Sequence, residues 1–453
     1  MHLSSWVEEN NNMISLFKKI LPEKLQKALK PRYHYALAFI SALVYRFPSR
    51  EIKIIAITGT KGKTSTAEIV NSILEEAGLK TALAGTLRFK IGDESVRNMY
   101  KMTMPGRFFL QKFIRKAVKQ KCDWIVLEMT SEGVKQFRHK FIALDALILT
   151  NISPEHIESH GSYKNYIQAK FQIAKSLEKS NKKRKVFIVN GDNEESRKFL
   201  SIKVREKYIF SKEDAIPYQE RETGILFSIN NTAIQSRLHG EFNLYNMLAG
   251  IAFAQTQDVS MATIKTALEN FIEIPGRRHV IAKDPFEVVI DYAHTIDSLE
   301  QLYKSFKGKL LVGVLGNTGG GRDVWKRPGM ARTADTYCAH VVLTNEDPYD
   351  EDPKKIIADM VKGFQKNIPE VILDRREAIK TAFKRALKIK IEHPDKKIAV
   401  LITGKGTDPY IMGASGNKTP WDDATVALEE LSLIHISEPT RLRRISYAVF
   451  CLK

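Results

Sequence analysis

The residues best suited to do chemistry lie in a glycine-rich turn between an apolar strand and a helix. The turn reads Gly59-Thr60-Lys61-Gly62-Lys63-Thr64-Ser65. Glycines let backbone N–H groups approach a phosphate, a lysine can neutralise the terminal phosphates, and a hydroxyl can ligate Mg²⁺. The turn is short, because Ile57 stands where the longer phosphate-binding loop has its first glycine. The segment therefore predicts a nucleoside triphosphate site at the start of a helix.

Apolar runs and helical stretches alternate around this turn. One run at 53–58 precedes the turn, a helix is expected from about Thr64 to Ala77, and further runs follow at 123–129, 146–151 and 185–190. Such alternation predicts a parallel sheet with crossover helices. We expect a central P-loop ATPase domain over residues 51–274, with the turn at the end of its first strand.

A second series of apolar runs begins beyond the turn at Pro275-Gly276. Its predicted strands lie at 287–292, 309–316, 340–345 and 397–404. They predict a C-terminal, Rossmann-like α/β domain over residues 275–430. The fold class of the chain is therefore α/β, with a short helical segment ahead of the two domains.

Residues 1–50 form a basic segment with eight Lys and Arg against three Glu. Apolar residues at helical spacing between Ile14 and Leu29 predict helix, with breaks at Pro22 and Pro31, and a second helix is predicted over about 33–45. These helices are expected to pack on the next domain. The alternative is a helix that lies on a membrane surface, because apolar and basic faces occur together.

The phosphate turn and the motifs after it resemble the Mur ligase family. Within this family they are most similar to the ligases that add the third amino acid to UDP-N-acetylmuramoyl-L-alanyl-D-glutamate. The matching segments, within about residues 50–430, are Glu128-Met129-Thr130-Ser131, Thr150-Asn151-Ile152-Ser153-Pro154-Glu155-His156, Ala169-Lys170, Gly240-Glu241-Phe242-Asn243-Leu244-Tyr245-Asn246, Asp291-Tyr292-Ala293-His294-Thr295, Lys326-Arg327-Pro328-Gly329-Met330 and Gly404-Lys405-Gly406. Each motif alone is weak, and their shared order along the chain makes the resemblance specific.

The resemblance implies an ATP-dependent ligase that forms an amide bond through an acyl phosphate. Lys63 would contact the β- and γ-phosphates, and Thr64 with Glu128 would hold a first Mg²⁺. A second Mg²⁺ would be held by His156 and by a carbamate on Lys170, because carbamylation turns a cation into an anion with oxygen donors. Cations near the transferred phosphoryl group would offset its developing charge. The implied catalytic residues are Lys63, Glu128, His156 and Lys170.

The resemblance also implies how the rest of the nucleotide and the other two substrates bind. Asn246 would contact adenine, and Arg277 and Asp291 would reach the nucleotide from the C-terminal domain, so that the domains close over the site. The positions that match the binding site of the acyl substrate, a muramyl dipeptide, are Thr103, Met104, Thr130, Gln136 and Arg138. The free amino acid would meet Arg322, Glu346, Asp347, Pro348, Tyr349, Gly404 and Asp408.

The amino-acid site departs from the family pattern. Members that add diaminopimelate carry Asp-Asn-Pro-Arg where this chain has Glu346-Asp347-Pro348-Tyr349. The missing arginine removes a bidentate partner for the distal carboxylate, and an acidic pair suits an amine-bearing side chain, so we expect lysine or ornithine. The chain also has Thr407 and Asp408 where the family has His-Glu, which keeps the acid and loses the imidazole.

The basic N-terminal segment stands where typical members carry a domain that grips uridine diphosphate. The sequence therefore allows two acceptors, a UDP-linked and a lipid-linked muramyl peptide. A lipid-linked acceptor would give residues 1–50 a reason for peripheral contact with a membrane.

Composition limits the other classes of protein. The chain has 453 residues, of which 43% are apolar and 27% charged, which is typical of globular proteins and excludes disorder. No apolar run reaches the roughly 18 residues that cross a bilayer, and three distant cysteines, Cys122, Cys338 and Cys451, favour a reducing compartment. The net charge of +19 is spread along the chain without a nucleic-acid-binding motif. We expect a cytoplasmic monomer that binds phosphorylated substrates and no nucleic acid.

Residues 431–453 resemble no protein family. They match the conceptual translation of a sequencing adapter followed by a flow-cell primer, and such scars are excluded from fold prediction. The alternative is a genuine basic C-terminal strand. On the first interpretation the natural C-terminus is open.

Two other functions remain as alternatives. One is another amide ligase of the superfamily, such as a folylpolyglutamate or cyanophycin synthetase, and the signatures at 291–294 and 326–330 argue against it. The other is a non-catalytic ATP-binding partner subunit, and the presence of all four implied catalytic residues argues against that.

Overall fold

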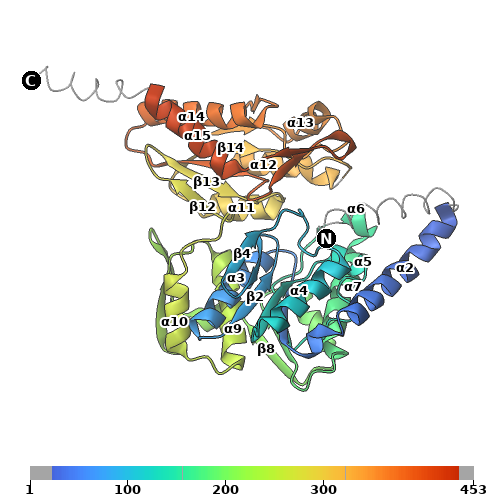
Figure 1. Ribbon diagram of the computed structural model, residues 1–453. Helices are drawn as coiled ribbons and strands as arrows, with labels where there is room; N and C mark the ends of the chain where they lie inside the picture. The colour runs from blue at the N-terminus through green and yellow to red at the C-terminus, as the bar shows by residue number, and fades with distance from the viewer. Residues whose placement is uncertain (1–22, 156, 322, 438–453) are drawn as a thin grey trace, which may run out of the picture.

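The computed structural model describes residues 23–155, 157–321 and 323–437. Two α/β domains are stacked, with the C-terminal domain above the central domain in Figure 1. His156 and Arg322, both implied as site residues, lie outside the described residues, as do 1–22 and 438–453. The predicted fold class is confirmed.

The central domain is built on an eight-stranded sheet with the strand order β4-β3-β2-β5-β1-β6-β7-β8. The six strands from β2 to β8 in this order are parallel, and β3 and β4 form an antiparallel edge. The strands are β1 (Lys53–Thr58), β2 (Thr81–Ala84), β3 (Arg88–Ile91), β4 (Glu94–Arg97), β5 (Trp124–Glu128), β6 (Ala146–Leu149), β7 (Val186–Asn190) and β8 (Glu206–Phe210).

Helices cover both faces of this sheet because alternate strand residues point to opposite sides. Ile54 and Ala56 of β1 enter one core, which α4 and α7 cover, whereas Ile55 and Ile57 enter the other, which α3, α9 and α10 cover. A three-stranded sheet of β9 (Tyr218–Arg221), β10 (Gly224–Ile229) and β11 (Thr232–Ser236) adjoins α10. The helices are α3 (Lys63–Glu76), α4 (Arg107–Lys119), α5 (Ser131–Lys135), α6 (Ile157–His160), α7 (Tyr163–Glu178), α8 (Glu194–Arg197), α9 (Glu241–Thr256) and α10 (Met261–Asn270).

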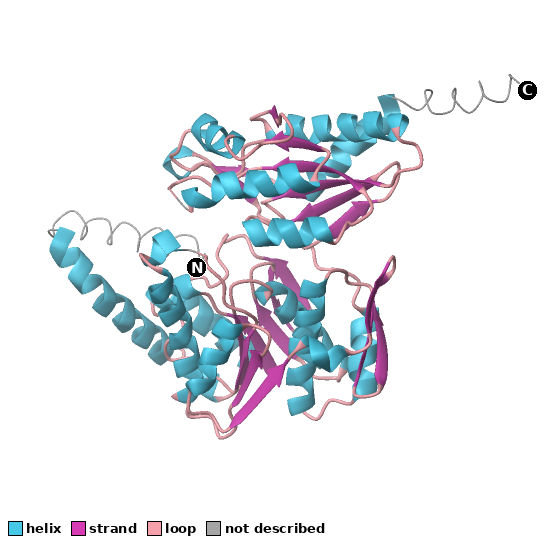
Figure 2. Cartoon of the chain, turned by 180° about the vertical axis from the view of Figure 1, so that it is seen from behind, coloured by secondary structure: helices cyan, strands magenta, loops and turns pink. Residues whose placement is uncertain are grey.

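The C-terminal domain is a six-stranded sheet between two helical layers, seen from behind in Figure 2. Its strand order is β12-β13-β17-β14-β15-β16, with β12 antiparallel at the edge. One core lies under α11, α12 and α13, and the other lies under α14 and α15. The elements are β12 (His279–Ala282), β13 (Glu287–Asp291), β14 (Leu310–Leu315), β15 (His340–Leu343), β16 (Glu370–Val371), β17 (Ile398–Thr403), β18 (Tyr410–Met412), β19 (Lys418–Pro420), α11 (Ile296–Lys304), α12 (Arg327–Tyr337), α13 (Pro353–Val361), α14 (Arg375–Glu392) and α15 (Asp423–Ser437).

The N-terminal segment differs from its prediction. A single helix, α2 (Glu23–Val44), runs through Pro31, so the predicted break at this proline is wrong. A proline inside a helix removes one hydrogen bond, at a cost of about 3 kcal/mol, and packing of buried Ala38 and Ala42 helps to offset this cost. Helix α2 packs on α4, which agrees with the prediction that this segment packs on the next domain. The side chains of Ile40 and Leu43 are exposed. The helix predicted around residues 14–21 lies outside the described residues.

The C-terminal end extends the fold slightly beyond its expected limit. Helix α15 continues to Ser437, and Leu431, the first residue of the suspected tail, is buried in the core beneath α14. Within the described residues, no helix is both long and apolar enough to span a bilayer. The thiols of Cys122 and Cys338 are buried and free in this part of the chain.

Candidate active site

The phosphate turn joins the carboxyl end of β1 to α3, at the edge of the sheet where ligands of open α/β sheets bind. Gly62 has φ 80° and caps the helix, and a Cβ at this position would lie 2.4 Å from Asn246 Oδ1. A Cβ on Gly59 would lie 1.9 Å from Thr150 Oγ1. Both glycines are therefore required by close packing, which holds the turn between α9 and the loop after β6.

Lys63 is the first residue of α3, and its ammonium folds back over the turn. Its Nζ donates to the carbonyl oxygens of Gly59 at 3.0 Å and Thr60 at 2.8 Å. Burial lowers the pKa of Lys63, and the charge of Arg277 acts in the same direction, while Glu155 and Glu128 oppose it. The ammonium thus lies at the centre of the turn, where a bound phosphate would compete for it.

Glu128 ends β5 and points its carboxylate at the start of α3. Oε2 accepts hydrogen bonds from the hydroxyls of Thr64 and Thr86, each at 3.0 Å, and Oε1 accepts the Thr86 N–H at 2.8 Å. Burial raises the pKa of Glu128 despite these bonds. A hydroxyl and a carboxylate side by side are hard oxygen donors, so Thr64 and Glu128 fit the Mg²⁺ that was expected here.

Lys170 lies on α7 and reaches the same turn from the other side. Its side chain is 2% exposed, its Nζ donates to Gly59 O at 2.5 Å, and it lies 5.0 Å from the centre of the Tyr166 ring. Tyr166 in turn shares a 2.7 Å hydrogen bond with the Thr60 hydroxyl. Burial lowers the pKa of Lys170 well below its ordinary value, and the charge of Lys63 adds to this. Its amine therefore has a raised uncharged fraction, the form that can react with CO₂.

The second predicted metal position is described only in part, because His156 lies outside the described residues. Its neighbour Glu155 is buried and contacts His294 of the C-terminal domain, with 3.4 Å between Oε1 and Nε2. In the part of the chain that the structure describes, no cluster of three or more His, Cys, Asp and Glu side chains is arranged to hold a metal.

A cavity of about 540 Å³ lies between the two domains at this turn. Thr60 to Ser65 and Asn246 line it from the central domain, and Arg277 and Asp291 line it from the C-terminal domain. The Arg277 guanidinium lies 4.2 Å from the centre of the Tyr292 ring. The implied ATP-binding residues other than Gly59 thus all line one cavity, which can hold a nucleotide between the domains.

Two of these residues also have structural roles. The Asp291 carboxylate accepts the N–H groups of Arg278 and Ala293, each at 2.6 Å. The Asn246 amide accepts from the Thr66 hydroxyl at 3.2 Å and donates to Asn243 Oδ1 at 3.0 Å. The contacts of Asp291 join the end of β13 to the residue before β12, and those of Asn246 join α9 to α3. The roles of both residues toward a nucleotide stay predictions.

The residues implied for the acyl substrate form one group beside this cavity. Thr103 shares a 2.8 Å hydrogen bond with Thr86, and Met104 Sδ accepts the Thr130 N–H at 3.3 Å. Arg138 donates to the Met104 carbonyl and to Gln136 Oε1, the latter at 2.8 Å. The loop after β4 and the start of α5 thus lie together, next to the carboxylate of Glu128.

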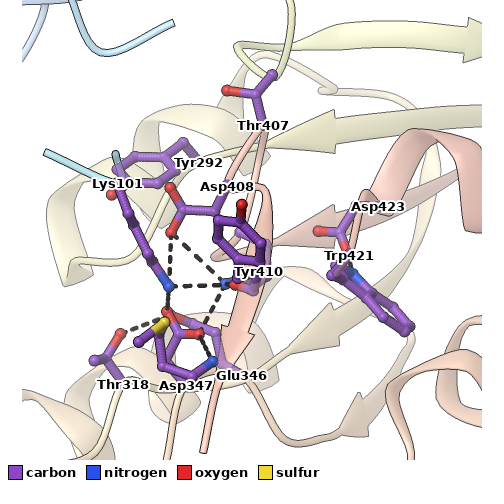
Figure 3. A network of polar contacts seen from close by, with 12 residues as sticks. Lys101, Tyr292, Thr318, Glu346, Asp347, Thr407, Asp408, Tyr410, Trp421 and Asp423 are labelled. Carbon is purple, nitrogen blue, oxygen red and sulfur yellow. Dashed lines mark hydrogen bonds and ion pairs between the residues drawn. The ribbon is translucent and has the colours of Figure 1, made fainter. Parts of the chain in front are cut away.

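The residues implied for the amino acid form a second group, in the C-terminal domain (Figure 3). Glu346 accepts the Thr318 hydroxyl at 2.7 Å, and a Cβ on Gly404 would lie 2.3 Å from Glu346 Oε2. Asp347 accepts from Lys405 at 2.9 Å and from the Met412 N–H at 2.8 Å. Asp408 lies 3.6 Å from Lys405, and Tyr349, which follows Pro348, donates its N–H to Met412 O at 3.0 Å.

Three residues near the site received no role in the sequence analysis. Thr86 donates twice to Glu128, Glu155 affects the pKa of both buried lysines, and Lys101 pairs with Asp347 across the domain interface. An acid directly before His156 was a usable signal for Glu155. Thr86 and Lys101 lie in loops where nothing in the local pattern marks them.

Comparison with known proteins identifies the family to which the chain belongs. The pattern of the Mur ligase middle domain matches residues 57–254, and that of the Mur ligase, glutamate ligase domain matches residues 276–406. A UDP-N-acetylmuramoyl-L-alanyl-D-glutamate–2,6-diaminopimelate ligase of Syntrophomonas wolfei is 33% identical over an alignment of 420 residues, which covers 88% of this chain and 82% of the relative. The chain belongs to the Mur ligase family.

Other relatives of this Mur ligase support the same assignment. UDP-N-acetylmuramyl-tripeptide synthetase 2 of Oceanobacillus iheyensis is 32% identical over an alignment of 413 residues, which covers 88% of this chain and 82% of the relative. A solved UDP-N-acetylmuramoyl-L-alanyl-D-glutamate–2,6-diaminopimelate ligase is 27% identical, with a TM-score of 0.56 and coverage of 85% of this chain and 79% of that one. A folylpolyglutamate synthase of Mycobacterium tuberculosis has a TM-score of 0.68 at 17% identity, covers 86% of this chain and 96% of its own, and shares the fold alone.

Proposed function

We propose that this Mur ligase uses ATP to join a free amino acid to a muramyl dipeptide, as a step of peptidoglycan synthesis. The observation that carries the proposal is the convergence of Lys63, Lys170 and the Thr64–Glu128 pair on one glycine-rich turn, at a cavity between the domains. The relatives named above are ligases of this kind.

The reaction proceeds in two steps. A carboxylate oxygen of the dipeptide attacks the γ-phosphorus of ATP, the bond between this phosphorus and the ADP oxygen breaks, and an acyl phosphate forms. The amine of the amino acid then attacks the acyl carbon, the C–O bond to phosphate breaks, and the amine loses a proton as the amide forms. Both steps move negative charge onto phosphate oxygens, which cations stabilise.

The chain's own residues divide this work. Lys63 exchanges its two carbonyl partners for phosphate oxygens, and the turn's N–H groups hold the phosphates. Thr64 and Glu128 would hold a Mg²⁺ ion, which would supply further charge compensation at the phosphates. A carbamate on Lys170 and the side chain of His156 would provide ligands for a second ion. The low pKa of Lys170, caused first by burial, supports this modification because CO₂ reacts with the uncharged amine.

The acceptor group lies beside the phosphate turn, and the amino-acid group lies in the C-terminal domain. Thr103, Met104, Thr130, Gln136 and Arg138 position the acceptor so that its carboxylate faces the γ-phosphate. Tyr349 stands where diaminopimelate ligases have arginine, so no guanidinium at this position pairs with a distal carboxylate. We therefore assign lysine or ornithine as the amino acid.

A ligation screen tests the function and the choice of amino acid. ADP release and product mass are measured with ATP, Mg²⁺, and either UDP-linked or lipid-linked muramyl dipeptide, against lysine, ornithine, alanine and diaminopimelate. Lysine or ornithine should support turnover, with a mass gain equal to one residue. Turnover with diaminopimelate and none with lysine would overturn the amino-acid assignment, and no ligation in any arm would overturn the function.

A further inference from the structure

Lys101 crosses from the central domain to the acidic residues assigned to the amino acid, Glu346, Asp347 and Asp408, which are together called the amino-acid pocket. It lies in the loop between β4 and α4, and its φ of 52° is a sparsely populated conformation for a residue other than glycine. Its side chain pairs with Asp347, lies 3.4 Å from Asp408 Oδ2 and donates to Tyr410 O at 3.3 Å. Figure 3 shows its ammonium pointing between the two carboxylates. A primary ammonium on a flexible aliphatic stem thus already occupies the pocket.

The other ammonium in this cluster, that of Lys405, is a fixed part of the pocket. Its side chain is fully buried, and it donates to Asp347 at 2.9 Å and Tyr410 O at 2.6 Å, all within the C-terminal domain. The Lys101 side chain is 16% exposed and comes from the other domain. Opening of the two domains would therefore withdraw Lys101 and leave Lys405 in place.

The pocket carries excess negative charge once Lys101 is withdrawn. Glu346, Asp347 and Asp408 then face Lys405, while the nearby guanidinium of Arg375 is already paired with Asp423 at 2.8 Å. Glu346 is 3% exposed, and its Oε2 has no hydrogen-bond partner among the described residues. Burial lowers the pKa of Lys101, but the charges of Asp408 and Asp347 outweigh burial and hold it above its ordinary value. The withdrawn state is therefore a site for one further cation.

We propose that Lys101 is a tethered occupant of the side-chain pocket, and that its ammonium holds the place of the side-chain ammonium of the incoming diamino acid until the substrate displaces it. This inference rests on the proposed function, because it assigns the pocket to that reaction's amino acid. It adds a specificity-determining residue that the acceptor side of the molecule contributes.

The position of Lys101 also links the two substrates. The same loop carries Thr103 and Met104, which are assigned to the acceptor. An acceptor that reorders this loop would move Lys101, so that the amino-acid pocket opens when the acceptor is bound. Movement of this one loop would then make the acceptor bind before the amino acid.

Lysine binding to the full chain tests this inference. L-lysine and L-alanine are titrated calorimetrically into the wild-type, Lys101→Ala and Lys101→Arg proteins, each with a non-hydrolysable ATP analogue and with or without muramyl dipeptide. Lys101→Ala should bind lysine about three- to tenfold more tightly, because a tethered group competes at an effective concentration in the millimolar range. Alanine binding should change less than twofold, and Lys101→Arg should stay within about twofold of wild type.

Arg97→Gln provides the matched control for loosened domain closure. Arg97 crosses the same interface to Asp422 at 2.7 Å and to Thr407 O at 2.8 Å, without entering the pocket. It should not change the ratio of lysine to alanine affinity, and thermal unfolding checks that each variant is folded. Weaker or unchanged lysine binding in folded Lys101→Ala would overturn the inference. If Lys101→Ala binds lysine more tightly but no ligation occurs in any arm of the screen, the inference stands and the proposed function is wrong. If the wild type ligates lysine but Lys101→Ala does not bind it more tightly, the proposed function stands and the inference is wrong.

Discussion

A Lys63→Ala variant should stay folded and lose about 100- to 1,000-fold in kcat for amino-acid-dependent ADP release, the range found when one preorganised electrostatic donor is removed from an active site. The ammonium lies at the centre of the turn, where it donates to the carbonyl oxygens of Gly59 and Thr60. Removal of the ammonium takes away positive charge at the place where the γ-phosphate would gain negative charge in the transition state.

The measurement is kcat and KM for ATP by coupled ADP detection, with thermal unfolding as a check on the fold. Lys116→Ala is the matched control, because Lys116 pairs with Glu94 at 2.8 Å on the surface of the same domain. This control should retain wild-type kcat. A folded Lys63→Ala protein that keeps more than about a tenth of the wild-type kcat would contradict the assignment of Lys63.

A Lys170→Ala variant should lose a similar factor, about 100- to 1,000-fold, and should recover part of it with added formate or acetate. Lys170 is almost fully buried beside Gly59, so truncation leaves space in which a small carboxylate can replace the carbamate oxygens. Activity is measured at increasing carboxylate concentration, with ATP affinity measured in parallel.

Lys175→Ala, on the same helix, is the control for this experiment, because Lys175 pairs with Glu178 at 3.0 Å near the surface. It should show neither the loss nor the rescue. If Lys170→Ala is not rescued and its ATP affinity is unchanged, the carbamate assignment is lost. The alternative of a non-catalytic ATP-binding subunit then gains support if the wild type also lacks turnover.

Much of the fold could be predicted because the parallel strands are buried on both faces. The run at 53–58 coincides with β1, and the run at 123–129 contains β5. Some predicted strands are longer than the observed ones, because the sequence pattern continues into the following loop. The strand predicted at 146–151 is an example, since β6 ends at Leu149. The break at Pro31 failed because tertiary packing outweighed the local preference of proline.

The site could be predicted only where its residues lie in one short segment. The turn carries its own signal, since glycines, lysine and hydroxyl follow a strand directly. The pairing of Lys101 with Asp347 joins positions 246 residues apart across two domains, and no local pattern records such a contact. Glu128 and Lys170 became candidates through the resemblance, and the structure then placed both at the turn.

The two domains meet around the site through several polar contacts. Lys61 Nζ lies 3.2 Å from Asp297 Oδ2, and Glu155 contacts His294. The phosphate turn and the loop after β6 therefore both contact the C-terminal domain. Because Arg277 and Asp291 line the cavity from that domain, the nucleotide site that we propose is complete only when the domains are together. Domain closure is therefore part of the catalytic cycle that we propose.

Oxygen transfer from the acceptor to phosphate tests the central claim most directly. The muramyl dipeptide is labelled with oxygen-18 in its reacting carboxylate, and the released phosphate is analysed by mass spectrometry after ligation with ATP and lysine. An acyl phosphate requires that one labelled oxygen leave with each phosphate, so singly labelled phosphate should match the amide formed. Unlabelled phosphate, or release of AMP and pyrophosphate, would contradict the account.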